Sequence, residues 1–524
     1  MPEEAPPSPP PSRLPLGTLI AGCLAVCLAQ IGIAIPATLN GLFQEHLHPV
    51  GSQLTWISDA FLLPVTVLEL SFGVLGDLFG RKRLLVGGAA LLGAGEVVAA
   101  SSGGIHQLWM GQALAGLGAA ALFPTSLAMI AAGTHTHAQR ARAIAIWASS
   151  LSAGGFLAPL LGGITGTYGS WRWSFVVVAI IAAISALASV LLATDSRSPE
   201  GRSLDIGGQI TIGVGLFALL YAVIQGPTDG WGSASVVVAF VIAAAFIALF
   251  VAAEHRAASP LLRLDLFRNR SFAVASVVAV VGMFSFLGTA YGASIRLGPI
   301  QHQTPMRTAF AFLLLNGITP FLTPLTSRLL ARVSARRLLT AGLLLIAAGD
   351  FLAATLDVDD RALTSLILPL GLVGIGFAFT VSSITATAVN TVPVHLAGMA
   401  SASTNLLRDF GFTLGPAVIG AVALSQAASQ VTTKLAQLPP ASQTAAHEVL
   451  KEGGPLALNS VPATSPPGAA RAYALDALGH GYSIGFVVCG SAALFAAVLA
   501  LLALHGRTEK HEPTEAPQAV TVTG

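Results

Sequence analysis

The sequence predicts an all-α polytopic membrane protein with fourteen transmembrane helices. Composition is the first observation behind this prediction: of 524 residues, 54% are hydrophobic and 10% are charged, whereas soluble proteins carry about 25% charged residues. The mean hydropathy of +0.76 agrees, so most of the surface must face lipid. A repeat is the second observation, because two patterns recur after about 254 and 257 residues, which predicts two related halves.

Spanning helices are expected where about 20 mainly apolar residues follow one another, because a helix rises 1.5 Å per residue and the hydrocarbon core is about 30 Å thick. An even number of spans places both ends of the chain on one side of the membrane. Fourteen segments meet the criterion, near residues 16–37, 53–72, 84–102, 107–128, 143–165, 172–194, 207–226, 235–253, 271–293, 306–326, 338–357, 364–387, 404–426 and 481–505.

The repeated patterns divide these spans into two sets of six, with two extra helices between them. DLFGRKRLL corresponds to ARVSARRLL, and Gly154-x-x-x-Ala158-Pro159 corresponds to Gly411-x-x-x-Gly415-Pro416. Residues 427–480, rich in Ala, Ser, Pro and Gln, are expected to form a flexible outer loop. The expected domains are a disordered cytosolic tail (1–15), an N-terminal six-helix half (16–194), two inserted helices (207–253), a C-terminal six-helix half (271–505) and a second cytosolic tail (506–524).

Positive charge predicts the orientation, because Lys and Arg are retained in cytoplasmic loops. With the N-terminus inside, 19 of the 26 Lys and Arg residues fall in inner segments and 7 in outer segments or span mouths. The N- and C-termini are therefore expected to be cytoplasmic.

Several functions are disfavoured by composition. A net charge of +2 and 7% aromatic residues offer no basic or stacking surface for nucleic acid. Cys23, Cys27 and Cys489 lie in apolar stretches and are expected to be packing residues. Two His-x-His pairs in loops offer too few ligands for a closed zinc site, so we expect no metal; solvated loops are favoured over pH sensing. They are His46 with His48 and His135 with His137.

A short loop between the second and third spans predicts a charged latch. It reads GVLGDLFGRKRLL, in which Gly73 and Gly80 allow tight turning and Asp77 can pair with Arg81; Arg83 completes the cluster. The pattern closely resembles the loop signature of the major facilitator superfamily. An ordinary positive-inside loop would explain the bases but not the Gly/Asp/Gly spacing.

The fifth span carries closely spaced small residues and a proline. Small residues four apart let helices approach, and proline removes one helical hydrogen bond. The segment resembles the antiporter signature of the same superfamily, which implies a kinked gating helix. The matching residues are Gly154, Ala158, Pro159, Gly162 and Gly163.

Two further segments, SPLLRLDLFRNRSF and NLLRDFGFTLGPAVIGA, resemble the fourteen-span drug:proton antiporter family. The resemblance implies a major facilitator fold of two six-helix halves plus two inserted helices, with the substrate bound between them near mid-membrane. It also implies export of drugs, antibiotics or related metabolites from a bacterial cell across the plasma (inner) membrane. The energy source would be the proton gradient, with no cofactor.

The family's usual coupling residues are absent from two spans. Relatives commonly carry an acid in span 1, where this chain has Gln30, and an arginine in span 4, where it has Gln112. An ionisable group inside the membrane is a functional candidate. Span 2 borders the central cavity by family architecture, so Asp59 or Glu69 is the preferred proton carrier. The alternative places Asp59 at the outer water interface and pairs Glu69 with the basic loop.

The remaining intramembrane charges receive structural expectations. Glu96 and Asp350 lie in spans that are outer supports in the family and are expected to be paired or near an interface. Arg408 and Asp409 are expected in a cytoplasmic gate, with a positive-inside anchor as the alternative. Negative charge in the cavity would favour cationic substrates.

Two other functions stay open. An uncoupled facilitator or neutral-metabolite exporter of the same fold would explain the missing span 1 acid. A membrane enzyme acting on lipid-linked donors would need clustered acids or a metal site in an outer loop, and the sequence shows neither.

Overall fold

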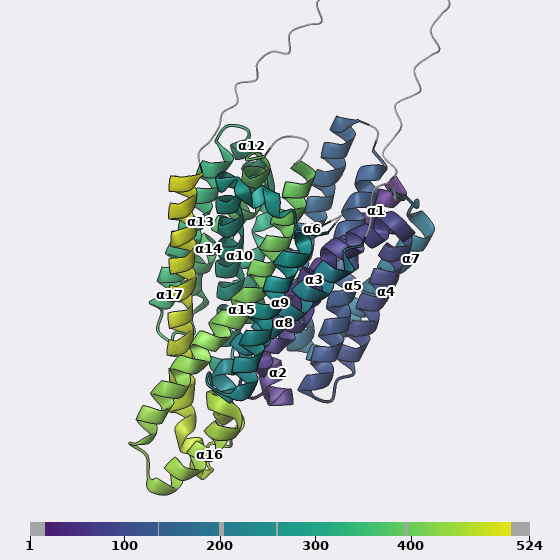
Figure 1. Cartoon of the computed structure of the whole chain (residues 1–524). Helices are drawn as coiled ribbons and strands as arrows, with labels where there is room; N and C mark the ends of the chain where they lie inside the picture. The colour runs from purple at the N-terminus through teal and green to yellow at the C-terminus, as the bar shows by residue number, and fades with distance from the viewer. Residues whose placement is uncertain (1–15, 135, 199–203, 258–259, 393–396, 505–524) are drawn as a thin grey trace, which may run out of the picture.

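The computed structural model describes residues 16–134, 136–198, 204–257, 260–392 and 397–504. Within these residues the chain is all-helical, and fourteen helices are long and apolar enough to cross a membrane (Figure 1). The predicted fold class and number of spans are therefore confirmed. The two predicted tails and His135 lie outside the described residues.

The helices fall into two groups joined by a helical pair, α8 (Ile206–Asp229) and α9 (Ala234–Glu254). The N-terminal group contains α1 (Leu16–Ala34), η1 (Ile35–Thr38), α2 (Asn40–Leu47), α3 (Gln53–Phe79), α4 (Arg81–Ala100), α5 (Ile105–Ala132), α6 (His137–Tyr168) and α7 (Trp171–Leu192). The C-terminal group contains η2 (Leu264–Arg268), α10 (Arg270–Ile295), η3 (Arg296–Ile300), α11 (Pro305–Phe312), η4 (Leu313–Gly317), α12 (Thr319–Leu330), α13 (Ala335–Ala354), α14 (Leu363–Val389), α15 (Ala397–Leu435), α16 (Pro440–Ala457), η6 (Leu458–Ser460), η7 (Pro466–Ala470) and α17 (Arg471–Ala503).

Polar caps fix where several helices begin. Asp205 accepts a hydrogen bond of 2.7 Å from the backbone N–H of Gly208 at the start of α8. Asn269 caps α10 in the same way through the N–H of Ser271, at 3.0 Å. These side chains satisfy N–H groups that the first helical turn leaves unpaired.

Glycines hold α4 against α5 and α13 against α14 at backbone distance. A Cβ at Gly95 would lie 2.6 Å from the Gly111 carbonyl oxygen, and one at Gly349 would lie 2.5 Å from the Pro369 carbonyl oxygen. Gly95 and Gly349 are 254 positions apart, as are Gly88 and Gly342 in the same two contacts. Close helix approach thus recurs at corresponding positions in the two groups.

The α8–α9 pair lies against both groups rather than within either. Helix α8 packs on α3 and α15, and α9 packs on α8 (Figure 1). Gln209 of α8 donates to the Val67 carbonyl oxygen of α3 at 2.6 Å. The pair therefore covers the line along which α3 and α15 meet.

Residues 427–480 are folded, so the expectation of a flexible loop is wrong. Helix α15 continues to Leu435, and α16, η6 and η7 pack against the ends of other helices. Asn459 donates to the Pro299 carbonyl oxygen at 2.7 Å, and the Gly51 N–H donates to the Gly453 carbonyl oxygen at 2.7 Å. Backbone and amide hydrogen bonds, which composition does not reveal, order this segment.

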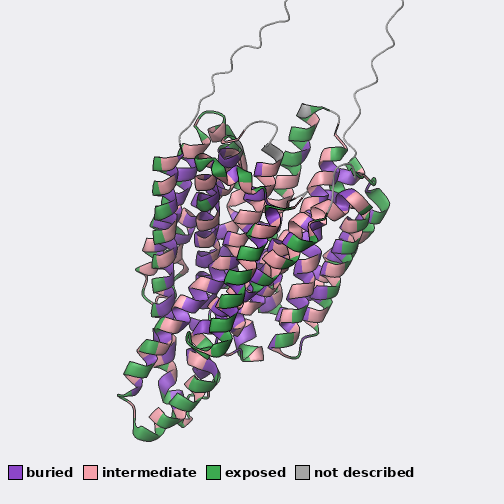
Figure 2. Cartoon of the chain, viewed as in Figure 1, coloured by how far each residue is buried: buried purple, intermediate pink, exposed green. Residues whose placement is uncertain are grey.

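Exposed positions lie on the outward faces of the bundle (Figure 2), and many of the exposed residues are large and apolar. Leu187 and Leu191 of α7 are 58% and 69% exposed, and Val241 of α9 is 62% exposed. A protein surrounded by water rarely exposes so many large apolar residues together. This surface is suited to lipid chains.

Candidate functional site

A cavity of about 1310 Å³ lies between the two groups of helices. It is lined by α1, α3, α5 and α6 on one side and by α10, α12, α14 and α15 on the other. It opens at the end of the bundle that carries Arg81, where the lining residues Arg140, Arg263 and Asp265 are exposed. We call this the Arg81 end, and the opposite end the α16 end.

Contacts between the groups close the cavity at the α16 end. Asn40 donates to Ser294 at 2.8 Å, and the hydroxyls of Thr55 and Tyr291 lie 2.7 Å apart. A Cβ at Gly41 would lie 3.0 Å from the Cα of Gly298, so the backbones nearly touch. Among the described residues, these contacts bring the two groups together and close the cavity at this end.

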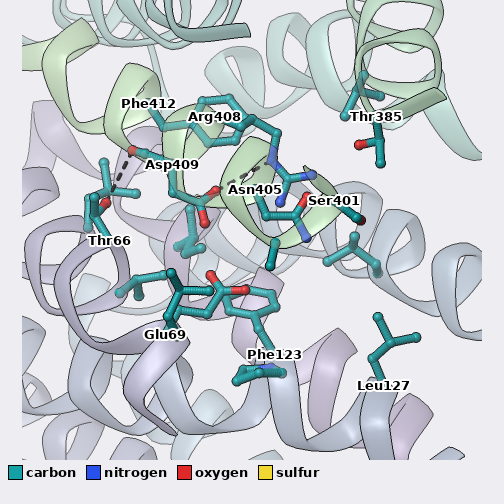
Figure 3. A pocket seen from close by; sticks show the side chains of 18 of the residues that line it. Thr66, Glu69, Phe123, Leu127, Thr385, Ser401, Asn405, Arg408, Asp409 and Phe412 are labelled. Carbon is teal, nitrogen blue, oxygen red and sulfur yellow. Dashed lines mark hydrogen bonds and ion pairs between the residues drawn. The ribbon is translucent and has the colours of Figure 1, made fainter. Parts of the chain in front are cut away.

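Glu69 of α3 and Asp409 of α15 lie near each other in the wall of the cavity. Their side chains reach into the same part of the cavity and interact electrostatically, with Arg408 beside Asp409 (Figure 3). The Arg408 Nε atom lies 3.4 Å from Asp409 Oδ1. One turn deeper, the Thr66 and Thr413 hydroxyls lie 2.7 Å apart, and Thr66 also donates to the Asp409 carbonyl oxygen at 3.1 Å, so hydrogen bonds join α3 to α15 here.

The structure separates the two preferred proton carriers. Glu69 lines the cavity, whereas Asp59 is fully buried and outside its lining, and neither Asp59 oxygen has a hydrogen-bond partner among the described residues. Asp59 is one turn from Thr55 and within electrostatic range of Tyr291. It therefore lies inside the closed contact, not at an outer water interface.

The carboxyl groups of Asp350 and Glu96, which were both expected to be paired or near an interface, differ in their hydrogen bonding. Asp350 accepts hydrogen bonds from Thr289 at 2.6 Å and Ser285 at 3.2 Å, so it is paired as expected. Glu96 is fully buried and neither oxygen has a partner in the described part of the chain, which contradicts the expectation. Gln112, at the usual arginine position, is likewise fully buried and unpartnered there, and it does not line the cavity.

The predicted latch is partly assembled. Asp77 and Arg81 form a 2.7 Å ion pair, and Arg81 also donates to the Ala128 carbonyl oxygen at 3.3 Å. Gly80 has φ of +107°, a conformation that favours glycine, which lets α4 start directly after α3. Gly73 lines the cavity, but Arg83 is exposed and has no partner among the described residues.

The predicted gating helix is α6, and its small residues contact both groups. A Cβ at Gly154 would lie 2.6 Å from the Cys27 carbonyl oxygen of α1, and one at Gly162 would lie 2.0 Å from the Thr38 hydroxyl. One at Gly163 would lie 2.6 Å from the Cβ of Ala309 in α11. Ala158 and Pro159 are buried within α6 between these contacts.

Several lining residues were missed by the sequence analysis. Asn316 enters the cavity from η4 opposite Gln30, and Phe286, Phe377 and Phe412 form an aromatic wall. A lone asparagine in the apolar run LLLNGI was the one available signal for Asn316. Phenylalanines in spans give none, because most of them face lipid or protein.

Two titratable groups at the α16 end lie outside the spans. Burial lowers the pKa of His302, and the neighbouring Arg471 and Arg361 add to the effect. Hydrogen bonds from Ser365 and the Ala362 N–H lower the pKa of Asp360. His302 is therefore neutral and Asp360 charged at neutral pH. No group of three or more metal-ligating side chains converges in the described ranges.

Comparisons with known proteins agree with this geometry. The family model of the Major Facilitator Superfamily matches residues 22–416. The Multidrug resistance protein Stp of Mycobacterium tuberculosis (strain CDC 1551 / Oshkosh) is 32% identical over 411 residues, covering 78% of this chain and 76% of that protein. The Tetracenomycin C resistance and export protein of Streptomyces glaucescens is 27% identical, covering 97% and 95%.

A solved structure shows the same fold. The crystal structure of a POT family transporter in complex with 5-aminolevulinic acid aligns with a TM-score of 0.62, covering 93% of this chain and 95% of that one. Its sequence identity of 11% supports a shared fold and nothing more specific.

Proposed function

Because the chain belongs to the major facilitator superfamily, we propose that it exports hydrophobic or amphipathic drugs, antibiotics or related metabolites in exchange for protons. The named relatives are a multidrug resistance protein and an antibiotic resistance and export protein. The match to the family model confirms the resemblance that the loop motif predicted. The proposed substrate class, drugs and antibiotics, is taken from the names of these relatives.

The excess of Lys and Arg supports a cytoplasmic Arg81 end. In that orientation the cavity faces the cytoplasm and the α16 end, facing outward, is closed. Export would then require the Asn40–Ser294 and Thr55–Tyr291 contacts to separate while the Arg81 end closes. The two groups correspond to the halves that rock in alternating access, and α8–α9 is the insertion between them.

The placement of Glu69 near Asp409 carries the proposal of proton coupling. Two carboxylates within electrostatic range repel each other, so a proton held by one of them removes the repulsion. The two side chains belong to α3 and α15, which the Thr66 and Thr413 hydroxyls join while the α16 end is closed. A proton at Glu69 therefore favours this inward-facing arrangement.

Loss of that proton to the cytoplasm reverses the interaction. Two carboxylates within electrostatic range repel each other, and Arg408, whose Nε atom lies 3.4 Å from Asp409, offsets one negative charge, not both. The repulsion favours separation of α3 from α15, which opens the α16 end to the outside. Proton entry and substrate release would then alternate on one pair of helices.

Proton release from acidified inside-out vesicles tests this proposal. Adding a substrate should release protons from wild-type vesicles and from an Asp59→Asn variant, and Glu69→Gln should abolish the release. Glutamine keeps the size and polarity of the side chain but carries no removable proton. Loss in Asp59→Asn alone would place the carrier at Asp59.

Substrate flux without proton movement in the wild type would favour the alternative, an uncoupled facilitator. Gln30 and Gln112, which stand where relatives carry charge, motivate that alternative. Gln112→Arg would then be the variant to test for restored coupling.

A further inference from the structure

Most acidic side chains that line the cavity lie beside basic ones. Asp77 pairs with Arg81 at 2.7 Å, and Asp265 lies 3.6 Å from Arg263. Arg408 lies 3.4 Å from Asp409 and within electrostatic range of Glu69. Glu254 accepts a hydrogen bond of 3.1 Å from the Leu262 N–H through one oxygen, and its other oxygen has no partner among the described residues. Among the described lining residues, the bases thus offset most of the negative charge that would attract a ligand cation.

Two uncharged amides converge in the deep part of the cavity. A Cβ at Gly155 would lie 3.9 Å from Gln30 Nε2 and 3.9 Å from the Cβ of Asn316, so both side chains border the same space. Both amides are half-buried and line the cavity, and the buried hydroxyl of Thr319, three residues beyond Asn316, has no hydrogen-bond partner among the described residues. Buried polar groups are normally satisfied, so this space suits a ligand with carbonyl or hydroxyl groups.

Aromatic faces border the same cavity from the C-terminal group. The Phe286 and Phe377 rings are stacked with centroids 3.6 Å apart and planes 11° apart, and the Phe412 ring lies 6.5 Å from Phe377. The indole N–H of Trp147 bonds Ser126 at 2.9 Å, which leaves its apolar ring for the cavity. Flat aromatic ligands pack well on such surfaces.

We infer that the cavity binds neutral, planar polycyclic aromatic compounds bearing carbonyl or hydroxyl groups, oriented by Gln30 and Asn316. The inference rests on the proposed function, since it takes this cavity as the transport site. It departs from the expected preference for cations because most acids of the wall lie beside bases. A volume of about 1310 Å³ accommodates several fused rings.

Equilibrium binding to the purified full-length protein in lipid nanodiscs tests this inference. The neutral probe is 1,8-dihydroxyanthraquinone and the cationic probe is tetraphenylphosphonium. Wild type should bind the neutral probe more tightly. Gln30→Leu and Asn316→Leu should each weaken that binding about tenfold, as loss of one hydrogen bond to a buried amide does. Gln437→Leu, at an exposed site of the α16 end outside the cavity lining, is the matched control.

A gain of function completes the test. Gln30→Glu introduces an unpaired carboxylate and should strengthen tetraphenylphosphonium binding. The inference is wrong if wild type prefers the cation, if neither probe binds, or if both leucine variants bind the neutral probe normally while keeping the wild-type melting temperature. Because no gradient is present, failure of proton coupling would leave these affinities unchanged and appears only in the vesicle assay.

Discussion

Asn40 donates a hydrogen bond of 2.8 Å to Ser294, which stands 254 positions further along the chain. The same separation relates Gly88 to Gly342 and Gly95 to Gly349. Asn40 and Ser294 therefore occupy corresponding positions in the two groups. The α16 end is closed by equivalent segments meeting each other, an arrangement that rocking of two related halves can open without unfolding either.

Cross-linking the α16 end should stop transport. A Cβ at Gly166 of α6 would lie 3.0 Å from the Cβ of Pro305 at the start of α11, near the 3.5–4.5 Å range of disulfides. In a background with Cys23, Cys27 and Cys489 replaced by alanine, Gly166→Cys with Pro305→Cys should lose export on oxidation and regain it on reduction. Single-cysteine variants are the controls. Full export by the oxidised pair would show that this end need not open.

Removing Arg81 should weaken the latch, whereas removing Arg83 should not. The Asp77–Arg81 pair is mostly buried, with side chains 9% and 11% exposed, and Arg81 also bonds Ala128. Arg81→Ala should lower stability by about 1–3 kcal/mol, the cost of losing hydrogen bonds to a charged group, and slow export. Arg83→Ala should change stability by less than about 0.5 kcal/mol. Thermal unfolding and vesicle export measure both; equal effects would refute the distinction.

Sequence reasoning predicted the spans well because lipid imposes a simple requirement on length and polarity. It failed for residues 436–470, whose order depends on particular contacts such as Asn459 to Pro299. It placed Glu69, Arg408 and Asp409 among candidates without predicting that Glu69 and Asp409 lie within electrostatic range of each other. These two residues are 340 positions apart, and only packing of α3 on α15 brings them together.

The repeat offset held more information than the sequence analysis extracted. Adding 254 to Glu96 gives Asp350, and adding it to Asn40 gives Ser294. Corresponding positions identify residues that share a depth in the bundle. They do not predict which neighbours satisfy them, because the residues around Asp350 and Glu96 differ in polarity.

Glycine contacts predict a sharp contrast between two alanine substitutions. A Cβ at Gly116 would lie 2.2 Å from the Phe61 carbonyl oxygen, so Gly116→Ala must push α5 away from α3, at a cost of about 1–3 kcal/mol. Gly87 has nothing within 4 Å of its position, and Gly87→Ala should stabilise α4 by up to about 1 kcal/mol. Melting temperatures in detergent should move in opposite directions. A shift of the same sign in both would argue against this packing.

The corresponding carboxyl groups Asp350 and Glu96 should respond oppositely to removal. Asp350 accepts hydrogen bonds from Ser285 and Thr289, so Asp350→Leu loses both and should destabilise the protein by about 1–3 kcal/mol. Glu96 has no partner among the described residues, and a buried polar group without one is costly, so Glu96→Leu should raise the melting temperature. Both variants place a leucine at a fully buried position, so each variant is the control for the other. Retained stability with lost proton release in Glu96→Leu would instead assign Glu96 to the proton path, since a residue kept at a cost to stability is one that function requires.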